Sequence, residues 1–214
     1  MTAPVTLPSP TKREARRQHR RDTILAVAQD YFLEHGYAGT TMSGIAAKLG
    51  GSKGTLWNHF PSKEELFAAV LQRATRTHHD QLVQILDPCG DLMPTLHRLC
   101  LTLLKKVTSP EAIALNRLII SEGTRFPEMS RIFFELAPHH TRLRVAEFLD
   151  GAMQRNQLRT ADPFDAARAL MALTMAGSHQ QLLMGQLDHV SLAQMDVDAR
   201  FALDVFLRAY APDR

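Results

Sequence analysis

The side chains best suited to chemistry in this sequence bind phosphate, and they gather near its N-terminus. A basic segment contains Arg16, Arg17 and Arg20, whose guanidinium groups can pair with phosphate oxygens. Further donors and acceptors follow within one short stretch: Ser52, Lys53, Thr55, Trp57, Asn58, His59 and Lys63. Side chains of these types contact phosphates and the edges of bases, so this part of the chain is a candidate nucleic-acid interface.

Other chemistries are poorly represented. Cys89, His97 and Cys100 could suggest a metal, but no second Cys/His pair completes a set of four ligands. The tandem pairs His78-His79 and His139-His140 cannot face one another along a helix, and we expect them to be solvated or at an interface. The sequence shows no glycine-rich phosphate loop, Ser/His/Asp arrangement or paired-carboxylate motif. We therefore expect no metal, no cofactor and no enzymatic activity.

Helices must position these residues, because apolar residues recur at helical spacing and no alternating strand pattern of useful length is present. The sequence predicts an all-α fold of about nine helices. Proline and glycine residues mark the boundaries of the predicted helices. Gly36 ends the first helix, Pro138 kinks or interrupts a long one, and Pro163 opens another. The predicted helices span residues 12–35, 42–49, 53–59, a helix opening at 62, 92–107, 111–122, 127–156, 164–184 and 191–211.

The stretch MSGIAAKLGGSKGTLWNHF, residues 42–60, has the layout of a helix-turn-helix. Ala46 is small enough for two helices to cross closely, and Gly50 supplies the turn, where positive φ is cheap only for glycine. Leu56 then anchors the second helix in the core. This spacing fits two helices that cross steeply with a short turn between them. Thr41 is the candidate N-cap of the first helix and a further DNA contact, while an ordinary helical hairpin is the alternative.

The composition supports a polyanion-binding head on a neutral body. The chain has 214 residues, 45% hydrophobic and 22% charged, with a net charge of +3. Residues 1–63 hold nine Lys/Arg and four Asp/Glu, a balance of +5, and the remainder has a balance of −2. No apolar run is long enough to span a membrane, and two cysteines cannot form a disulfide framework. We expect a cytoplasmic protein with a disordered arm (1–11), a DNA-binding domain (12–63) and a helical trunk (64–214).

The trunk contains many Met and Phe residues, which can line an adaptable apolar cavity or simply fill the core. A few polar residues among them are unusual for a core. The candidate cavity residues are Met93, His97, Arg117, Phe133, Phe134, Met171, Met175 and His179.

The helix predicted at 164–184 is apolar on nearly every side, which indicates a partner beyond its own trunk. Together with the last helix it could form a four-helix interface around a two-fold axis. The alternative is a central core helix in a monomer. The candidate interface residues are Ala169, Ala172, Leu173, Ala176, Gly177, Phe201 and Val205.

Residues 21–70 resemble the N-terminal DNA-binding domain of the TetR family of bacterial transcriptional regulators. One departure is Trp57, where the family usually has a tyrosine that touches phosphate, and another is Gly51, where an apolar residue is usual. The resemblance rests on Ile24, Leu25, Ala28, Phe32, Gly36, Tyr37, Thr41, Ile45, Ala46, Gly50, Ser52, Gly54, Thr55, Leu56, His59, Phe60, Lys63 and Leu66.

The trunk resembles the AefR-like subtype of this family, over residues 118–135 and over Asp162-Pro-Phe-Asp-Ala-Ala167. These resemblances imply a homodimeric repressor that binds double-stranded operator DNA and is released by a small apolar or amphipathic effector. Activation in place of repression stays open. The alternative from another class is a helical protein–protein adaptor whose basic head docks on an acidic partner.

Overall fold

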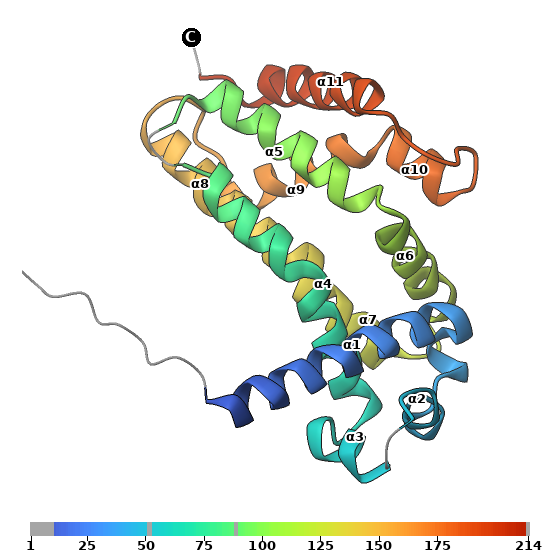
Figure 1. Ribbon diagram of the computed structural model, residues 1–214. Helices are drawn as coiled ribbons and strands as arrows, with labels where there is room; N and C mark the ends of the chain where they lie inside the picture. The colour runs from blue at the N-terminus through green and yellow to red at the C-terminus, as the bar shows by residue number, and fades with distance from the viewer. Residues whose placement is uncertain (1–10, 51–52, 88–89, 213–214) are drawn as a thin grey trace, which may run out of the picture. The chain divides into compact units, whose positions relative to one another are not determined.

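The structure is a computed structural model and describes residues 11–50, 53–87 and 90–212. Within these residues the chain forms the helices α1 to α11 and one π-helical segment, η1, and no strand (Figure 1). The expected all-α fold class is confirmed. The chain divides into two compact units, Met1–Val70 and Leu71–Arg214.

The first unit contains α1 (Lys12–Gly39), α2 (Met42–Lys48), α3 (Lys53–His59) and the start of α4 (Lys63–Ile85). Thr11 caps α1 through a reciprocal pair of hydrogen bonds with Glu14, so it is not part of the expected arm, whose other residues lie outside the described ones. Gly36 breaks α1 with a φ of 72°. The hydroxyl of Thr40 then donates to the carbonyl of Gly36 at 2.6 Å.

The core of the first unit forms on the face of α1 that the helical spacing predicts. Ile24, Leu25 and Ala28 are almost fully buried there. Phe32 packs against Phe67 of α4 with ring centroids 5.1 Å apart and an edge-to-face angle of 74°. Burying each large apolar side chain contributes about 1.5–3 kcal/mol, so this cluster fixes α1 on α4.

The second unit contains the rest of α4 and all later helices. Its core lies where α9 packs against α8 and α11 and where α11 packs on α5, around buried residues such as Leu99, Leu149 and Phe206. No helix among the described residues is long and apolar enough to cross a membrane. The helices are α5 (Leu92–Val107), α6 (Pro110–Glu122), α7 (Pro127–Phe134), η1 (Glu135–His139), α8 (His140–Gln154), α9 (Pro163–Met175), α10 (Ser178–Leu183) and α11 (Leu192–Tyr210).

Two of the predicted helices are divided in the structure. Pro138 interrupts the helix expected at 127–156, because its ring nitrogen has no proton to donate, and η1 separates α7 from α8. The single helix expected at 164–184 is wrong, since it breaks at Gly177 into α9 and α10. The Ser178 N–H there donates to the Asp198 carboxylate of α11 at 3.1 Å.

Candidate nucleic-acid interface

The helix-turn-helix of the first unit is held together by buried side chains where α2 and α3 cross. Ile45, Ala46 and Leu56 are each at most 2% exposed, so the two helices cross where the small side chain of Ala46 allows it. Gly50 has a φ of 62°, the conformation predicted for the turn. The Thr41 hydroxyl accepts the Gly44 N–H at 3.0 Å and so caps α2 as expected.

The predicted contact residues of α3 lie on its accessible side. Trp57 is 37% exposed, Asn58 is exposed, and Thr55 and His59 are half-buried. Leu56 between them is 1% exposed, so α3 has one buried side and one accessible side. Ser52 and the side chain of Lys53 lie outside the described residues.

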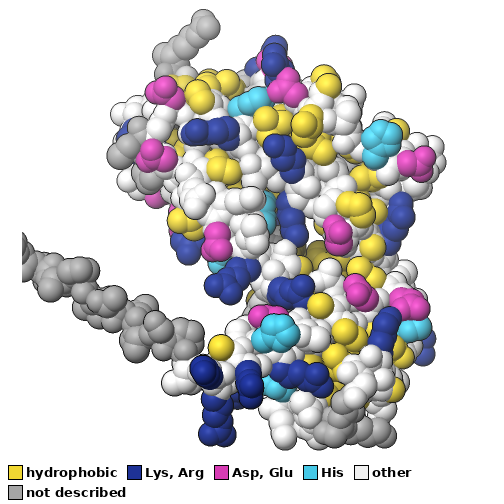
Figure 2. All heavy atoms as spheres, viewed as in Figure 1, with side chains coloured by type: hydrophobic (Ala, Val, Ile, Leu, Met, Phe, Trp, Pro, Cys, Tyr) yellow, Lys and Arg dark blue, Asp and Glu magenta, His cyan; other side chains and the backbone are white. Residues whose placement is uncertain are grey.

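The basic segment of α1 lies close to the end of α3. Arg16 and Arg17 are exposed, and Arg20 and Arg21 are half-buried. Burial lowers the pKa of His59, and the positive charges of Arg17, Arg21 and Arg20 lower it further. The two groups of predicted contact residues therefore form one positive surface, and Figure 2 shows Lys and Arg side chains gathered around the start of α1.

Lys63, predicted to contact phosphate, is half-buried and engaged within the first unit. Its Nζ donates to the Tyr37 carbonyl at 2.9 Å and lies 4.1 Å from the centre of the Tyr37 ring. The Tyr37 hydroxyl in turn donates to Glu64 Oε1 at 3.1 Å. Lys63 thus fastens the end of α1 to the start of α4, and an ammonium group has further protons for a phosphate.

Sequence reasoning missed a contact that holds α2 against α1. A Cβ added to Gly44 would meet the ring and hydroxyl of Tyr31, with Cζ at 2.9 Å. Lys48, at the end of α2, binds Glu34 of α1 at 2.9 Å. The sequence indicates this contact only in part. A glycine at position 44 predicts a close approach between helices only when the direction of the Tyr31 side chain is known.

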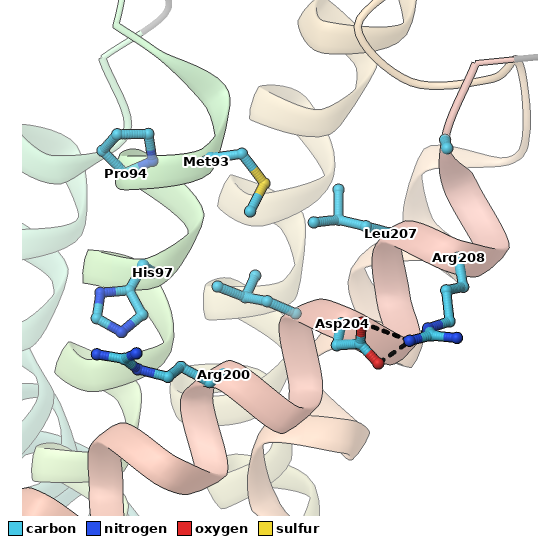
Figure 3. Close-up of a pocket in the computed structure, with 9 residues that line it drawn as sticks. Met93, Pro94, His97, Arg200, Asp204, Leu207 and Arg208 are labelled. Atoms are coloured by element: carbon cyan, nitrogen blue, oxygen red, sulfur yellow. Dashed lines mark hydrogen bonds and ion pairs between the residues drawn. The ribbon is translucent and has the colours of Figure 1, made fainter.

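Two of the candidate cavity residues of the trunk line one cavity. Met93 and His97 of α5 line a cavity of about 760 Å³ together with Leu203 and Leu207 of α11, and Figure 3 shows Met93, His97 and Leu207 around it. The other predicted residues are not among those that line this cavity. Arg117 donates to the carbonyls of Leu182 and Leu183, Phe134 stacks on His139, Phe133 and Met175 are half-buried, and Met171 and His179 are buried.

Polar side chains flank the cavity between α5 and α11. His97 of α5 and Arg200 of α11 point toward one another in Figure 3, and each contacts the Asp196 carboxylate, at 2.9 and 2.8 Å. Asp204 forms a two-pronged ion pair with Arg208. His97 is therefore held by a carboxylate of α11. Cys89 lies outside the described residues, and burial raises the pKa of Cys100 to about 11.

Six of the candidate interface residues are accessible or half-buried. Ala172 and Ala176 are exposed, Phe201 is 58% exposed, and Ala169, Leu173 and Val205 are half-buried. Gly177 has a contact within the chain. A Cβ at Gly177 would meet Asp198 Oδ1 at 2.7 Å, so this glycine makes room for a contact within the chain.

A crossed helix pair, a positive surface and an all-helical trunk are the features of a DNA-binding regulatory protein. Residues 24–70 match the model of the bacterial regulatory proteins of the tetR family. Residues 94–212 match the model of the AefR-like transcriptional repressor C-terminal domain. The chain belongs to the TetR family, with a C-terminal domain of the AefR-like type.

Individual relatives agree with this assignment. The chain is 45% identical over 67 residues to the HTH-type transcriptional activator FasR of Mycolicibacterium smegmatis, a match that covers 31% of this chain and 29% of FasR. The chain thus spans less than a third of that relative. A putative TetR-family regulator from Mesorhizobium loti superposes with a TM-score of 0.80 at 26% identity, covering 92% and 98% of the two chains. The flavonoid-responsive regulator FrrA superposes with a TM-score of 0.77 at 29% sequence identity, and the match covers 92% of this chain and 100% of FrrA.

Proposed function

We propose that this protein is a homodimeric transcriptional repressor that binds operator DNA through its helix-turn-helix and is released by a small apolar or amphipathic effector. The observation that carries DNA binding is the contact between the basic segment of α1 and the residue that follows α3, where the Arg21 guanidinium lies 5.3 Å from the centre of the Phe60 ring. This contact supports one surface that contains the end of α3 and the basic segment of α1. Such a surface can place α3 in a major groove while α1 contacts the phosphate backbone.

The accessible apolar residues of α9 and α11 support a dimer. Phe201 is an exposed phenylalanine of α11, and the small Ala172 and Ala176 are exposed on α9 and at its end, so a second copy could pack closely on these two packed helices. A two-fold dimer would present two α3 helices to successive major grooves, about 34 Å apart. Both half-sites would then bind as one unit, which raises the overall affinity.

The cavity between α5 and α11 supports an effector site. Its volume of about 760 Å³ lies within the range of small-molecule pockets, and Met93, Leu203 and Leu207 give it apolar walls. The likeness to the flavonoid-responsive FrrA favours an effector of this size. An effector can release DNA only through its different affinity for the bound and released states, so operator and effector weaken each other by the same factor.

The test is a gel-shift titration on the DNA that flanks the coding sequence. The wild type should shift this DNA, with an affinity that falls with salt at about −0.9 in log–log slope per phosphate contact. Arg17→Ala should weaken the shift and flatten the slope, and Arg168→Ala, which changes an exposed arginine of α9, serves as the control. No shift on this DNA, with tight binding to an acidic protein, would favour the adaptor and contradict the proposal.

A further inference from the structure

A groove between α4 and α8 of the trunk carries side chains that the proposed function does not use. Two cavities lie along it, of about 470 and 200 Å³, and both are lined by Val83 and Arg144. Because they share these two residues, they are neighbouring parts of the groove. The cavity of about 470 Å³ is by itself within the volume range of small-molecule sites.

The groove combines an apolar floor with positive charge. Leu136 and Phe148 contribute to the floor together with Val83, a valine that is 65% exposed although it sits in a folded trunk. The charged groups that face the groove from α4 are Arg76 and Asp80, and those from α8 and its end are Arg144, Glu147 and Arg155. Three arginines oppose two carboxylates, of which Glu147 already pairs with Arg144 at 3.0 Å.

Two histidines line the larger cavity of the groove. His79 of α4 and His140 of α8 have ring centroids 4.1 Å apart, with planes tilted by 31°. His79 Nε2 and His140 Nδ1 are buried and have no hydrogen-bond partner among the described residues. Burial lowers the pKa of His79, and the nearby positive charges of His140, Arg144 and, from α5, Lys106 lower it further, against Asp80. These surroundings favour the uncharged form of His79.

We propose that the groove between α4 and α8 binds a small organic anion with a short apolar tail, such as a medium-chain carboxylate. Arg76 and Arg144 pair with the anionic group, and Val83, Leu136 and Phe148 cover the tail. An anion beside His79 favours the charged form of its ring, so His79 takes up a proton when the ligand binds. Binding is consequently tighter at lower pH, as long as the ligand stays ionised.

This site can be tested without DNA, so its failure is distinguishable from failure of the proposed function. Sodium octanoate is titrated into the full chain in a calorimeter, with 1-octanol as the uncharged probe of equal tail length. Octanoate should bind and octanol should not. Arg76→Gln and Arg144→Gln should each weaken octanoate binding about tenfold, the loss of one charge-assisted contact. Arg168→Gln on α9, paired with Asp165 outside the groove, should leave it unchanged.

Proton uptake gives a second readout that a merely hydrophobic site would not show. The same titration in two buffers of different ionisation enthalpy, at about pH 6 and about pH 8, counts the protons bound. His79→Gln should reduce the uptake, and circular dichroism checks that the variant is folded. Equal binding of octanol, or binding unaffected by both arginine variants, would overturn the site. Octanoate binding with no proton uptake would overturn the role of His79.

Discussion

Single residues decide how the first unit contacts DNA, and Trp57 is the most exposed large side chain of α3. Its indole N–H is a donor only, whereas the tyrosine usual at this position can also accept. We expect Trp57→Phe to weaken operator binding by about 1 kcal/mol, the value of one hydrogen bond, with little change in stability. Trp57→Tyr should retain most of the affinity. Gel-shift titration with a thermal melt checks both, and equal affinity of the Phe variant would remove this contact.

Lys63 combines a structural and an electrostatic role at the residue scale. Removing its hydrogen bond to the Tyr37 carbonyl, in Lys63→Ala, should lower the free energy of unfolding by about 1–2 kcal/mol. The variant should also bind all DNA sequences more weakly and flatten the salt slope by about 0.9. Urea unfolding and binding at several salt concentrations separate the two effects. A lower stability with an unchanged slope would make Lys63 a purely structural residue.

His78 corrects the expectation that the histidine pairs are solvated or interfacial, because it is buried against the trunk. Burial, His79 and Lys106 lower the pKa of His78 to about 4. In the unfolded chain the pKa returns to about 6.5, so the unfolded state binds the proton more tightly. Stability from this group is complete above about pH 6.5 and is lost as the pH falls toward 4. The free energy of unfolding of His78→Gln should fall less steeply with decreasing pH over this window than that of the wild type. An equal slope for the two proteins would contradict this role of His78.

At the scale of elements, the break between α9 and α10 depends on a contact with α11. Gly177→Ala places a methyl group against Asp198, which holds the first N–H of α10, and should cost about 1–3 kcal/mol of unfolding free energy. The cost should shrink when Asp198 is already alanine, because the two changes share one contact. Denaturant unfolding of the single and double variants measures this coupling. If the two substitutions have additive effects on the free energy of unfolding, Gly177 does not act through its contact with Asp198.

At the scale of the whole molecule, the proposed dimer makes a separate prediction. Ala172 is exposed on α9, so Ala172→Arg should leave the single chain folded. At a two-fold seam the same arginine would be desolvated beside its copy, which costs several kcal/mol. The Ala172→Arg protein should sediment as a monomer and should bind the operator more weakly. The control Gln154→Arg, which changes an exposed residue of α8, should stay dimeric. A dimeric Ala172→Arg protein would place the interface elsewhere.

The sequence by itself determined the local features of this protein, because each depends on neighbours in the chain. Thr41 and Ser191 cap their helices through the backbone N–H three residues on, and Pro163 opens α9. Gly36 and Gly50 take the positive φ that their positions require. The family followed from the same local set of residues.

Only the tertiary structure decided which distant side chains meet. It placed Arg21 over the Phe60 ring, set Gly177 against Asp198, and brought Met93 and His97 to one cavity with Leu203 and Leu207. Helical periodicity says which face of a helix is buried, but not which face of which neighbour covers it. That choice is made by the packing of whole helices against one another, and residues far apart in sequence acquire their partners only there.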